Sequence, residues 1–186
     1  MKSFSQISTL ALAFFAAISL NAQSMDNTVM VGGEAMFPMK NIVENAVNSK
    51  AHTTLVAAVK AAGLVETLQG AGPFTVFAPS NDAFENLPAG TVETLLKPEN
   101  KSKLAGVLTY HVLAGKYDFK ALAKLIKKGK NTLTTVNGAT LTVMMNGARN
   151  IAVKDANGNV ANISVYDVYQ KNGVIHSLDT VLLPKM

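Results

Sequence analysis

The sequence predicts an α+β fold in which helices come first and antiparallel strands follow. Helical spacing of apolar residues dominates from Asn41 to Gly129, interrupted by one strand-like run at 74–78. After Gly129, alternating apolar and polar residues are separated by four Asn-Gly pairs, the strongest short signal for a β-hairpin. Because helices and strands are segregated along the chain, an architecture of alternating βαβ units is not expected.

Each expected helix combines an apolar face at helical spacing with a residue suited to begin or end it. In the first part of the chain, helices are expected from Asn41, from Thr53 to a left-handed cap at Gly63, and over the short segment 64–68. After the strand at 74–78, further helices are expected at 80–85, at 91–96, up to Tyr110, and from the cap residue Asp118 to Gly129.

The last third of the chain carries the strand signals. Asn-Gly occurs at 137–138, 146–147, 157–158 and 172–173. The runs between and after these pairs alternate with a period of two, which predicts strands with one face toward the core. No internal repeat is present, so we expect one copy of one module.

The first 22 residues have the layout of a secretory signal peptide. Lys2 gives a positive start, Ile7 to Leu20 is apolar, and Ala22 suits cleavage before Gln23. The apolar run is too short to span a bilayer comfortably, although an uncleaved anchor is the competing interpretation. No Cys follows the run, which excludes anchoring through a lipid-modified cysteine.

These features divide the chain into three parts. We expect residues 1–22 to be a signal peptide, residues 23–38 to form a flexible arm, and residues 39–186 to form the domain. The mature protein would then be secreted, or held in the periplasm or at the cell surface, without an integral membrane span.

Composition excludes several classes of function. The chain carries 17 Lys and Arg against 12 Asp and Glu, a net charge of +5, but Arg149 is its only arginine and the charges are dispersed. Nucleic-acid binding is therefore not expected. The lysines of the last helix, Lys120, Lys124, Lys127 and Lys128, are interpreted as a solvated face in preference to a dock for an anionic partner. With no cysteine, packing alone must hold the fold.

The sequence gives little support to a metal site or a catalytic triad. His52, His111 and His176 are not at a metal-ligand spacing. His176, Ser177 and Asp179 are the most triad-like group, but adjacent residues on a strand point to opposite faces, which separates His176 from Ser177. We interpret His176 as a neutral, hydrogen-bonded core residue. Neither a metal nor a cofactor is expected.

The strand-to-helix corner in FTVFAPSNDAF, residues 74–84, is interpreted as a structural joint. Pro79 fixes the backbone where the strand ends. Asn81 or Asp82 is expected to cap the following helix, and Phe84 to point back to the core. Thr75, in the strand of this joint, is assigned the same structural role.

Three segments in order resemble the conserved motifs of fasciclin-type domains, also called beta-Ig-H3/fasciclin domains. They are FTVFAPSNDAF at 74–84, LTYHVLAGKY at 108–117 and NGVIHSLDTVLLP at 172–184. The resemblance covers residues 41–184 and is closest to the secreted, single-domain bacterial members. It implies helices packed around a wedge-shaped β-sandwich, and a role in adhesion outside the cell.

The resemblance also implies where a partner would bind. In animal relatives, the Tyr-His motif and an Asp-Ile pair before the last motif are implicated in binding integrins. Tyr110-His111 matches the first. Asp167-Val168 matches the second, with Val in place of Ile, a departure that leaves the partner's identity open.

These positions differ in how well they suit direct contact. For Tyr110 and His111, a buried scaffold role is preferred, because the pair closes a helix. Asp167 breaks the alternation of ISVYDVY and is expected to be exposed, which makes it the better contact residue. Tyr166 and Tyr169 are expected to add exposed aromatic area.

The leading hypothesis is a monomeric, non-enzymatic adhesion module that binds an extracellular protein or glycan through its surface. The alternative is an accessory protein that binds a small molecule or polysaccharide, which requires a concave apolar pocket lined by Tyr or Phe. A hydrolase using His176 with Ser177 or Asp179 is the third hypothesis.

Overall fold

The computed structural model describes residues 28–185, so the signal peptide expected over residues 1–22 lies outside the described residues. The α-helices are α1 (Ile42–Ala46), α2 (Thr53–Ala62), α3 (Val65–Gln69), α4 (Asn81–Glu85), α5 (Thr91–Leu96), α6 (Lys101–Tyr110) and α7 (Phe119–Lys127). Two 3₁₀ turns, η1 (Lys50–His52) and η2 (Pro98–Asn100), precede α2 and α6.

The strands are β1 (Val29–Val31), β2 (Glu34–Met36), β3 (Phe74–Pro79), β4 (Val112–Ala114), β5 (Thr132–Thr134), β6 (Thr140–Met145), β7 (Ile151–Lys154), β8 (Val160–Gln170) and β9 (Gly173–Leu178). Strands β3 to β9 form one sheet in the order β4-β3-β9-β8-β7-β6-β5. Only the β3–β9 pair is parallel; the other pairs of this sheet are antiparallel.

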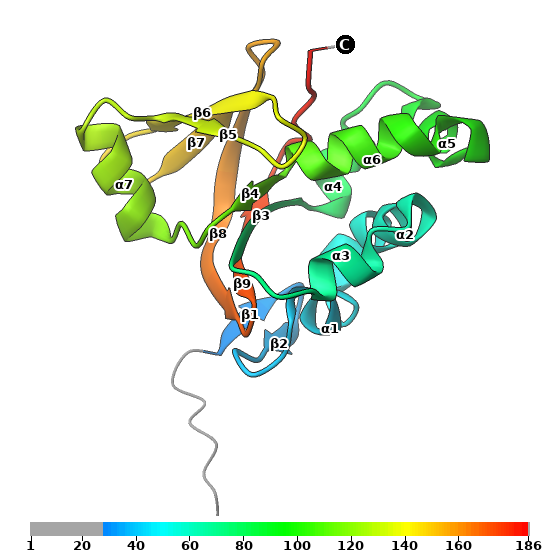
Figure 1. The fold of residues 1–186 in the computed structure, drawn as a ribbon, viewed down its shortest axis with the longest axis horizontal. Helices are drawn as coiled ribbons and strands as arrows, with labels where there is room; N and C mark the ends of the chain where they lie inside the picture. The colour runs from blue at the N-terminus through cyan, green and yellow to red at the C-terminus, as the bar shows by residue number, and fades with distance from the viewer. Residues whose placement is uncertain (1–27, 186) are drawn as a thin grey trace, which may run out of the picture.

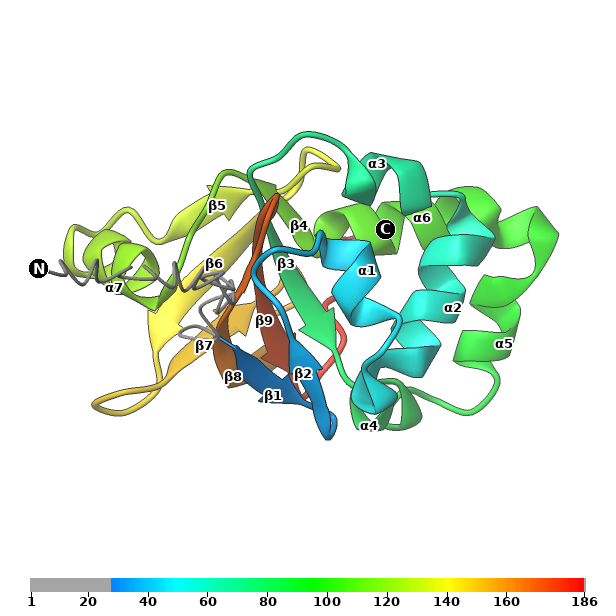
Figure 2. The ribbon, with the colours of Figure 1, turned by 90° about the horizontal axis from the view of Figure 1, so that it is seen from below.

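Helices α1 to α6 gather on one side of the sheet, and α7 covers its opposite end (Figures 1 and 2). This arrangement confirms the predicted α+β class, with helices mostly before and hairpins mostly after residue 129. Asp118 caps α7 as expected, because its Oδ1 accepts the Ala121 N–H at 2.8 Å. Gly63, at φ 74°, ends α2 in the left-handed conformation.

All four Asn-Gly pairs lie where consecutive antiparallel strands from β5 to β9 are joined, the fourth at the boundary between the turn and β9. In three of them the glycine has a positive φ, as a tight hairpin requires. Gly173 differs because it begins β9, where a Cβ atom would collide with the carbonyl oxygen of Phe74. The last glycine therefore permits the close approach of β3.

Strand β8 bends the sheet into a sandwich-like wedge. Its first half pairs with β7 and its second half with β9, with register shifts between Ile163 and Val168. One apolar core lies between the curved sheet and α7, around Phe77, Leu122 and Ile151. A second core lies between the sheet and helices α1, α2, α3 and α6.

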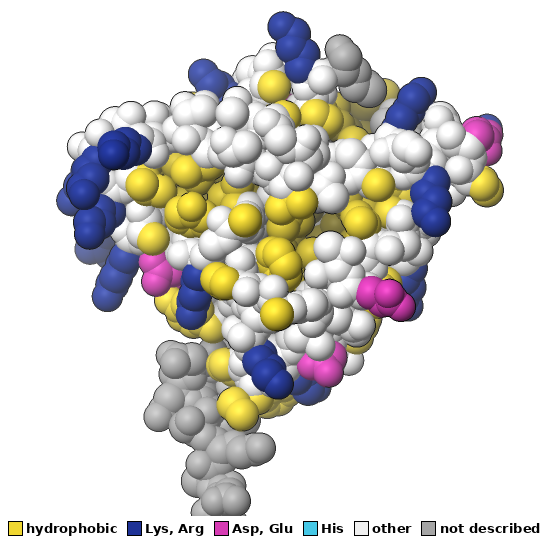
Figure 3. All heavy atoms as spheres, viewed as in Figure 1, with side chains coloured by type: hydrophobic (Ala, Val, Ile, Leu, Met, Phe, Trp, Pro, Cys, Tyr) yellow, Lys and Arg dark blue, Asp and Glu magenta, His cyan; other side chains and the backbone are white. Residues whose placement is uncertain are grey.

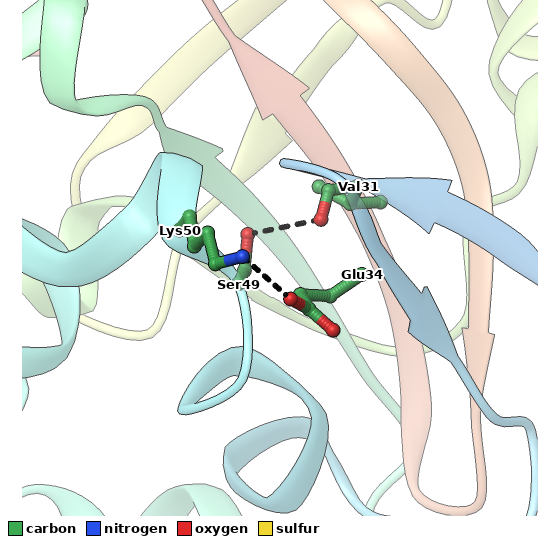
Figure 4. Close-up of polar contacts among 4 residues, drawn as sticks. All are labelled: Val31, Glu34, Ser49 and Lys50. Atoms are coloured by element: carbon green, nitrogen blue, oxygen red, sulfur yellow. Dashed lines mark hydrogen bonds and ion pairs between the residues drawn. The ribbon is translucent and has the colours of Figure 1, made fainter.

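Residues 29–36, expected to lie in a flexible arm, form the β1–β2 hairpin instead. Burial explains the difference, since Val31 and Met36 are 6% and 2% exposed in the second core. Two polar contacts join the hairpin to the helical side (Figure 4): Lys50 Nζ lies 3.0 Å from Glu34 Oε1, and Ser49 Oγ donates to the Val31 carbonyl at 3.5 Å. Two three-residue strands offer too little alternation to be recognised in the sequence.

The joint at 74–84 uses a different cap from the one expected. Ser80, not Asn81 or Asp82, caps α4, because its Oγ accepts the Ala83 N–H at 3.3 Å. Asn81 reaches across to the start of α2, where its Oδ1 accepts the Thr54 N–H at 3.1 Å. Asp82 is exposed, while Phe84 is half-buried against the core. The corner therefore joins two helices as well as a strand and a helix.

Thr75 and Pro79 lie in the strand of this joint. Pro79 is the last residue of β3 and pairs with Leu178 of β9. Thr75 is fully buried. Its hydroxyl donates to the Gly115 carbonyl at 2.7 Å and accepts the Tyr117 N–H at 2.8 Å. Thr75 therefore fixes the loop between β4 and α7.

Candidate functional site

The Tyr110-His111 pair lies inside the protein. Tyr110 is fully buried, and its hydroxyl donates to the Thr140 carbonyl at 2.8 Å and accepts the Ala156 N–H at 3.0 Å. His111 is 3% exposed. The pair therefore ties the end of α6 to the strands and to the C-terminal segment, and neither side chain is available to a partner.

The charge state of His111 follows from its surroundings. Its Nδ1 donates to the Val107 carbonyl at 2.8 Å, and its Nε2 accepts the Leu182 N–H at 3.0 Å. Burial lowers the pKa of His111 to about 4. The imidazole is therefore neutral at pH 7.

The Asp167-Val168 pair sits on the bulge of β8. Asp167 has φ 54° and is the only residue of 28–185 other than glycine with a positive φ. This turn of the backbone sends Val168 into the second core, where it is 2% exposed. Asp167 is half-buried, less exposed than expected, and its Oδ1 accepts the Phe119 N–H at 2.7 Å.

His176 lies directly under this bulge. Its Nδ1 accepts the Asp167 N–H at 3.3 Å, and its Nε2 donates to the Tyr117 carbonyl at 2.8 Å. The ring is fully buried, and burial lowers the pKa of His176. It therefore links β9 to the bulge and to the loop before α7 as a neutral side chain.

The two tyrosines expected to be exposed differ from each other. Tyr166 points inward: its hydroxyl accepts the Ile151 N–H at 2.7 Å, and its ring packs edge-on against Phe119 at 5.3 Å. Tyr169 lies at the surface, half-buried, with Lys116 Nζ 4.5 Å above its ring. Both tyrosines are half-buried, but only Tyr169 lies beside a cation, whereas the Tyr166 hydroxyl is engaged with β7.

The Tyr169 hydroxyl donates to Asp118 Oδ2 at 3.3 Å. Burial raises the pKa of Tyr169, and the carboxylates of Asp167 and Asp118 add to the effect. Lys116, Asp118, Asp167 and Tyr169 thus form one cluster, which we call the β8-bulge surface. Exposed lysines continue from it along α7, and Figure 3 shows their dark blue side chains along one edge of the molecule.

A polar group that the sequence did not predict lies on the other face of β9. His52 Nε2 is 2.8 Å from Ser177 Oγ, and His52 Nδ1 is 2.8 Å from Ser49 Oγ. All three residues are buried, and burial lowers the pKa of His52. Ser177 thus faces away from His176, as expected. Its partner is His52, which lies 125 residues away in sequence, so no local spacing of residues could reveal the pair.

This Ser–His pair lacks two parts of a hydrolase. The residue behind His52 is a serine, which cannot stabilise an imidazolium as a carboxylate does. Ser177 also lies within β9, which pairs with both β3 and β8. Its backbone is therefore committed to the sheet and not free to bind an oxyanion. The arrangement suits a structural link between η1 and the sheet.

The Ser–His pair borders a concave space between the helices and the sheet, which we call the apolar cleft. Its volume is about 90 Å³. Its walls come from the β1–β2 hairpin, from α1 to α3, from α6 and from the sheet, and include Val31, Met36, Val56, Val59, Val76 and Ile175. Figure 3 shows apolar side chains gathered in a hollow between α3 and α6. Aliphatic side chains dominate the walls, with Phe74 and Phe77 but no tyrosine.

Neither a membrane span nor a metal centre is found in the described part of the chain. None of the helices within residues 28–185 has the length and apolar character needed to cross a bilayer. Within the same residues, no three His, Asp or Glu side chains gather as metal ligands would.

Comparison with known proteins gives concordant matches. The model of the fasciclin domain matches residues 50–184. Protein sll1483 of Synechocystis is 42% identical over 98% of this chain and 95% of its own length. The cell surface glycolipoprotein MPB83 of Mycobacterium bovis is 36% identical over 88% of this chain and 68% of its own length.

Among solved structures, the FAS1 domain pair of the insect cell adhesion molecule Fasciclin I superposes with a TM-score of 0.70 at 18% identity. The match covers 77% of this chain and 51% of that chain, which contains two such domains. At this identity the likeness supports the fold.

Proposed function

Because the chain belongs to the fasciclin domain family, we propose that it is an exported, non-enzymatic adhesion-type module that binds a protein or glycan outside the cell. The names of its relatives support this role, since one is a cell surface glycolipoprotein and another a cell adhesion molecule. The geometry adds support, because the buried histidines and the Ser–His pair are arranged as structural links.

We place the contact region at the β8-bulge surface. Of the six residues that the sequence nominated, Tyr110, His111 and Val168 are buried, and Tyr166 is half-buried with its hydroxyl bonded to Ile151. Asp167 and Tyr169 remain accessible, next to the exposed Lys116. An aromatic ring beside a cation and two carboxylates is a surface of the kind that partners recognise.

The charge around this surface indicates the chemistry of the partner. Lys120, Lys124 and Lys127 are exposed on α7 and Lys128 directly after it, and the first turn of α7 adjoins the bulge through Asp118 and Asp167. The sequence alone favoured a solvated face for these lysines. Their continuity with Lys116 and Tyr169 is the observation that carries the proposal, and it favours an acidic partner such as a uronic acid polysaccharide.

A binding experiment with defined polysaccharides tests this proposal. The purified protein is passed over immobilised alginate, which carries carboxylates, and over dextran, which is neutral. We expect retention on alginate that weakens with salt, because the contacts are between exposed charges. Lys116→Glu combined with Lys120→Glu should abolish retention.

The matched control is Lys97→Glu combined with Lys103→Glu, which changes the charge equally at exposed positions on the α5–α6 side. The proposal predicts that this control keeps most of the retention. Equal loss in both double variants would show attraction to net charge alone and would contradict the assigned surface.

A further inference from the structure

We propose that the apolar cleft binds the hydrocarbon chain of a fatty acid, with its carboxylate at the mouth beside Lys60. This site is separate from the β8-bulge surface and goes beyond the adhesion role. It also gives a specific form to the hypothesis of a small-molecule binder, since the cleft is lined mainly by aliphatic side chains.

The walls of the cleft favour hydrocarbon over water. Protein interiors pack about as densely as organic crystals, whereas this cleft leaves a space of about 90 Å³ against apolar side chains. Apolar cavities tend to stay dry and take up apolar ligands. By the same measure one water needs about 15 Å³, so the cleft has room for roughly six groups of that size.

The buried and half-buried polar residues that border the cleft are already paired. Both ring nitrogens of His52 are occupied by Ser49 and Ser177. Both ring nitrogens of His111 are occupied by backbone groups. The Thr109 hydroxyl donates to the Ala105 carbonyl at 2.7 Å. A polar ligand atom placed inside would find these groups engaged, so the buried part of the ligand must be apolar.

The mouth of the cleft, unlike its interior, favours a charged group on the ligand. Lys60, in the last turn of α2, is the one charged residue among those that line the cleft, and its side chain is exposed. Within residues 28–185, the single ion pair joins Lys50 to Glu34, so Lys60 has no carboxylate partner there. An aliphatic chain that ends in a carboxylate matches both the walls and the mouth.

The β1–β2 hairpin forms one wall of the cleft. Val31 and Met36 line the cleft, and the contacts Ser49–Val31 and Lys50–Glu34 hold their strands against the helical side (Figure 4). The hairpin therefore closes one side of the cleft.

A chain-length series measures the hydrocarbon part of the proposal. Isothermal titration of the purified protein with butanoate, hexanoate and octanoate should show an affinity that rises about fourfold per methylene group. Octanoate, four methylene groups longer, should then bind about 250-fold more tightly than butanoate. Equal affinities across the series would overturn the proposal.

Two substitutions within the lining locate the bound chain. Ala46→Phe fills the cleft from α1 and should abolish octanoate binding, while Ala57→Phe on the exposed face of α2 should leave it unchanged. Because Ala46→Phe could disturb folding, Val56→Phe on α2 provides a second obstruction. Folded variants of both kinds that still bind octanoate with the original affinity would overturn the assignment to the cleft.

The head group is tested separately. Lys60→Gln should weaken octanoate binding a few-fold, as expected for an exposed ion pair, and leave octanol binding unchanged. Lys97→Gln is the matched control. Unchanged octanoate binding in Lys60→Gln would overturn the position of the carboxylate. Lys116→Glu should not alter octanoate binding, so failure of the adhesion proposal and failure of this one give different results.

Discussion

The Asp167 carboxylate accepts the Phe119 backbone N–H at 2.7 Å, and this hydrogen bond joins the bulge of β8 to the first residue of α7. The same bulge turns Val168 into the core and leaves Tyr169 at the surface beside Lys116. One backbone irregularity therefore couples the interior of the protein to the proposed contact region.

Asp167→Ala should lower the free energy of unfolding by about 2 kcal/mol, because it removes a hydrogen bond to a charged acceptor and places a Cβ-bearing residue without a polar side chain at positive φ. Asp167→Asn should cost less, because asparagine tolerates this conformation and keeps an acceptor oxygen. Urea unfolding measures both. The exposed control Glu85→Ala should change stability by less than about 0.5 kcal/mol; an equal loss there would contradict the role of the bulge.

Stability should fall as the pH drops from about 6.5 toward 4. His52, His111 and His176 have lowered pKa values in the folded protein because they are buried. As the pH falls, the histidines of the unfolded chain therefore take up protons before those of the folded protein. The contribution of the neutral histidines to the free energy of unfolding is complete above pH 6.5 and is lost below it. His111 alone, with its pKa lowered to about 4, accounts for roughly 3 kcal/mol of this loss in the free energy of unfolding. Unfolding free energies that stay constant between pH 7 and pH 4.5 would contradict the buried, neutral assignment.

Ser177→Ala should destabilise the protein by about 1–3 kcal/mol, because it leaves the buried Nε2 of His52 without a hydrogen-bond partner. Thermal or chemical unfolding checks this value against Ser102→Ala, an exposed serine on α6. A loss no larger than that of the control would mean that the Ser–His pair contributes nothing to the fold.

Ser80→Ala should cost about 1 kcal/mol through loss of the α4 cap, whereas Asp82→Ala should cost less. Chemical unfolding of the two variants decides which residue caps the helix. A larger effect for Asp82 would restore the assignment made from the sequence.

The parts of the fold that the sequence predicts are those with local signals. The Asn-Gly turns, the cap at Asp118 and the helix end at Gly63 each depend on residues within a few positions of one another. The capping role of Ser80 was missed because three adjacent polar residues compete for it, and the backbone at residue 80 decides among them.

The rest of the fold depends on contacts between distant residues. The β1–β2 hairpin forms because Val31 and Met36 reach a core made by other segments. The pairing of His52 with Ser177 and the inward turn of Tyr166 likewise need the assembled sheet. For the candidate site, the family resemblance identified the region around Asp167, but the broken alternation of ISVYDVY could not show that Tyr169 meets Lys116 while the Tyr166 hydroxyl bonds to β7.

The central claim is that the Tyr-His motif holds the protein together while the β8-bulge surface contacts the partner. The most direct test compares Tyr110→Phe with the double variant Lys116→Glu and Lys120→Glu, measuring both unfolding free energy and retention on alginate. Tyr110→Phe should lose about 1–3 kcal/mol of stability because its hydroxyl bonds to Thr140 and Ala156 are removed, and should keep full retention while folded. The double variant should keep its stability and lose retention; the reverse pattern would contradict the account.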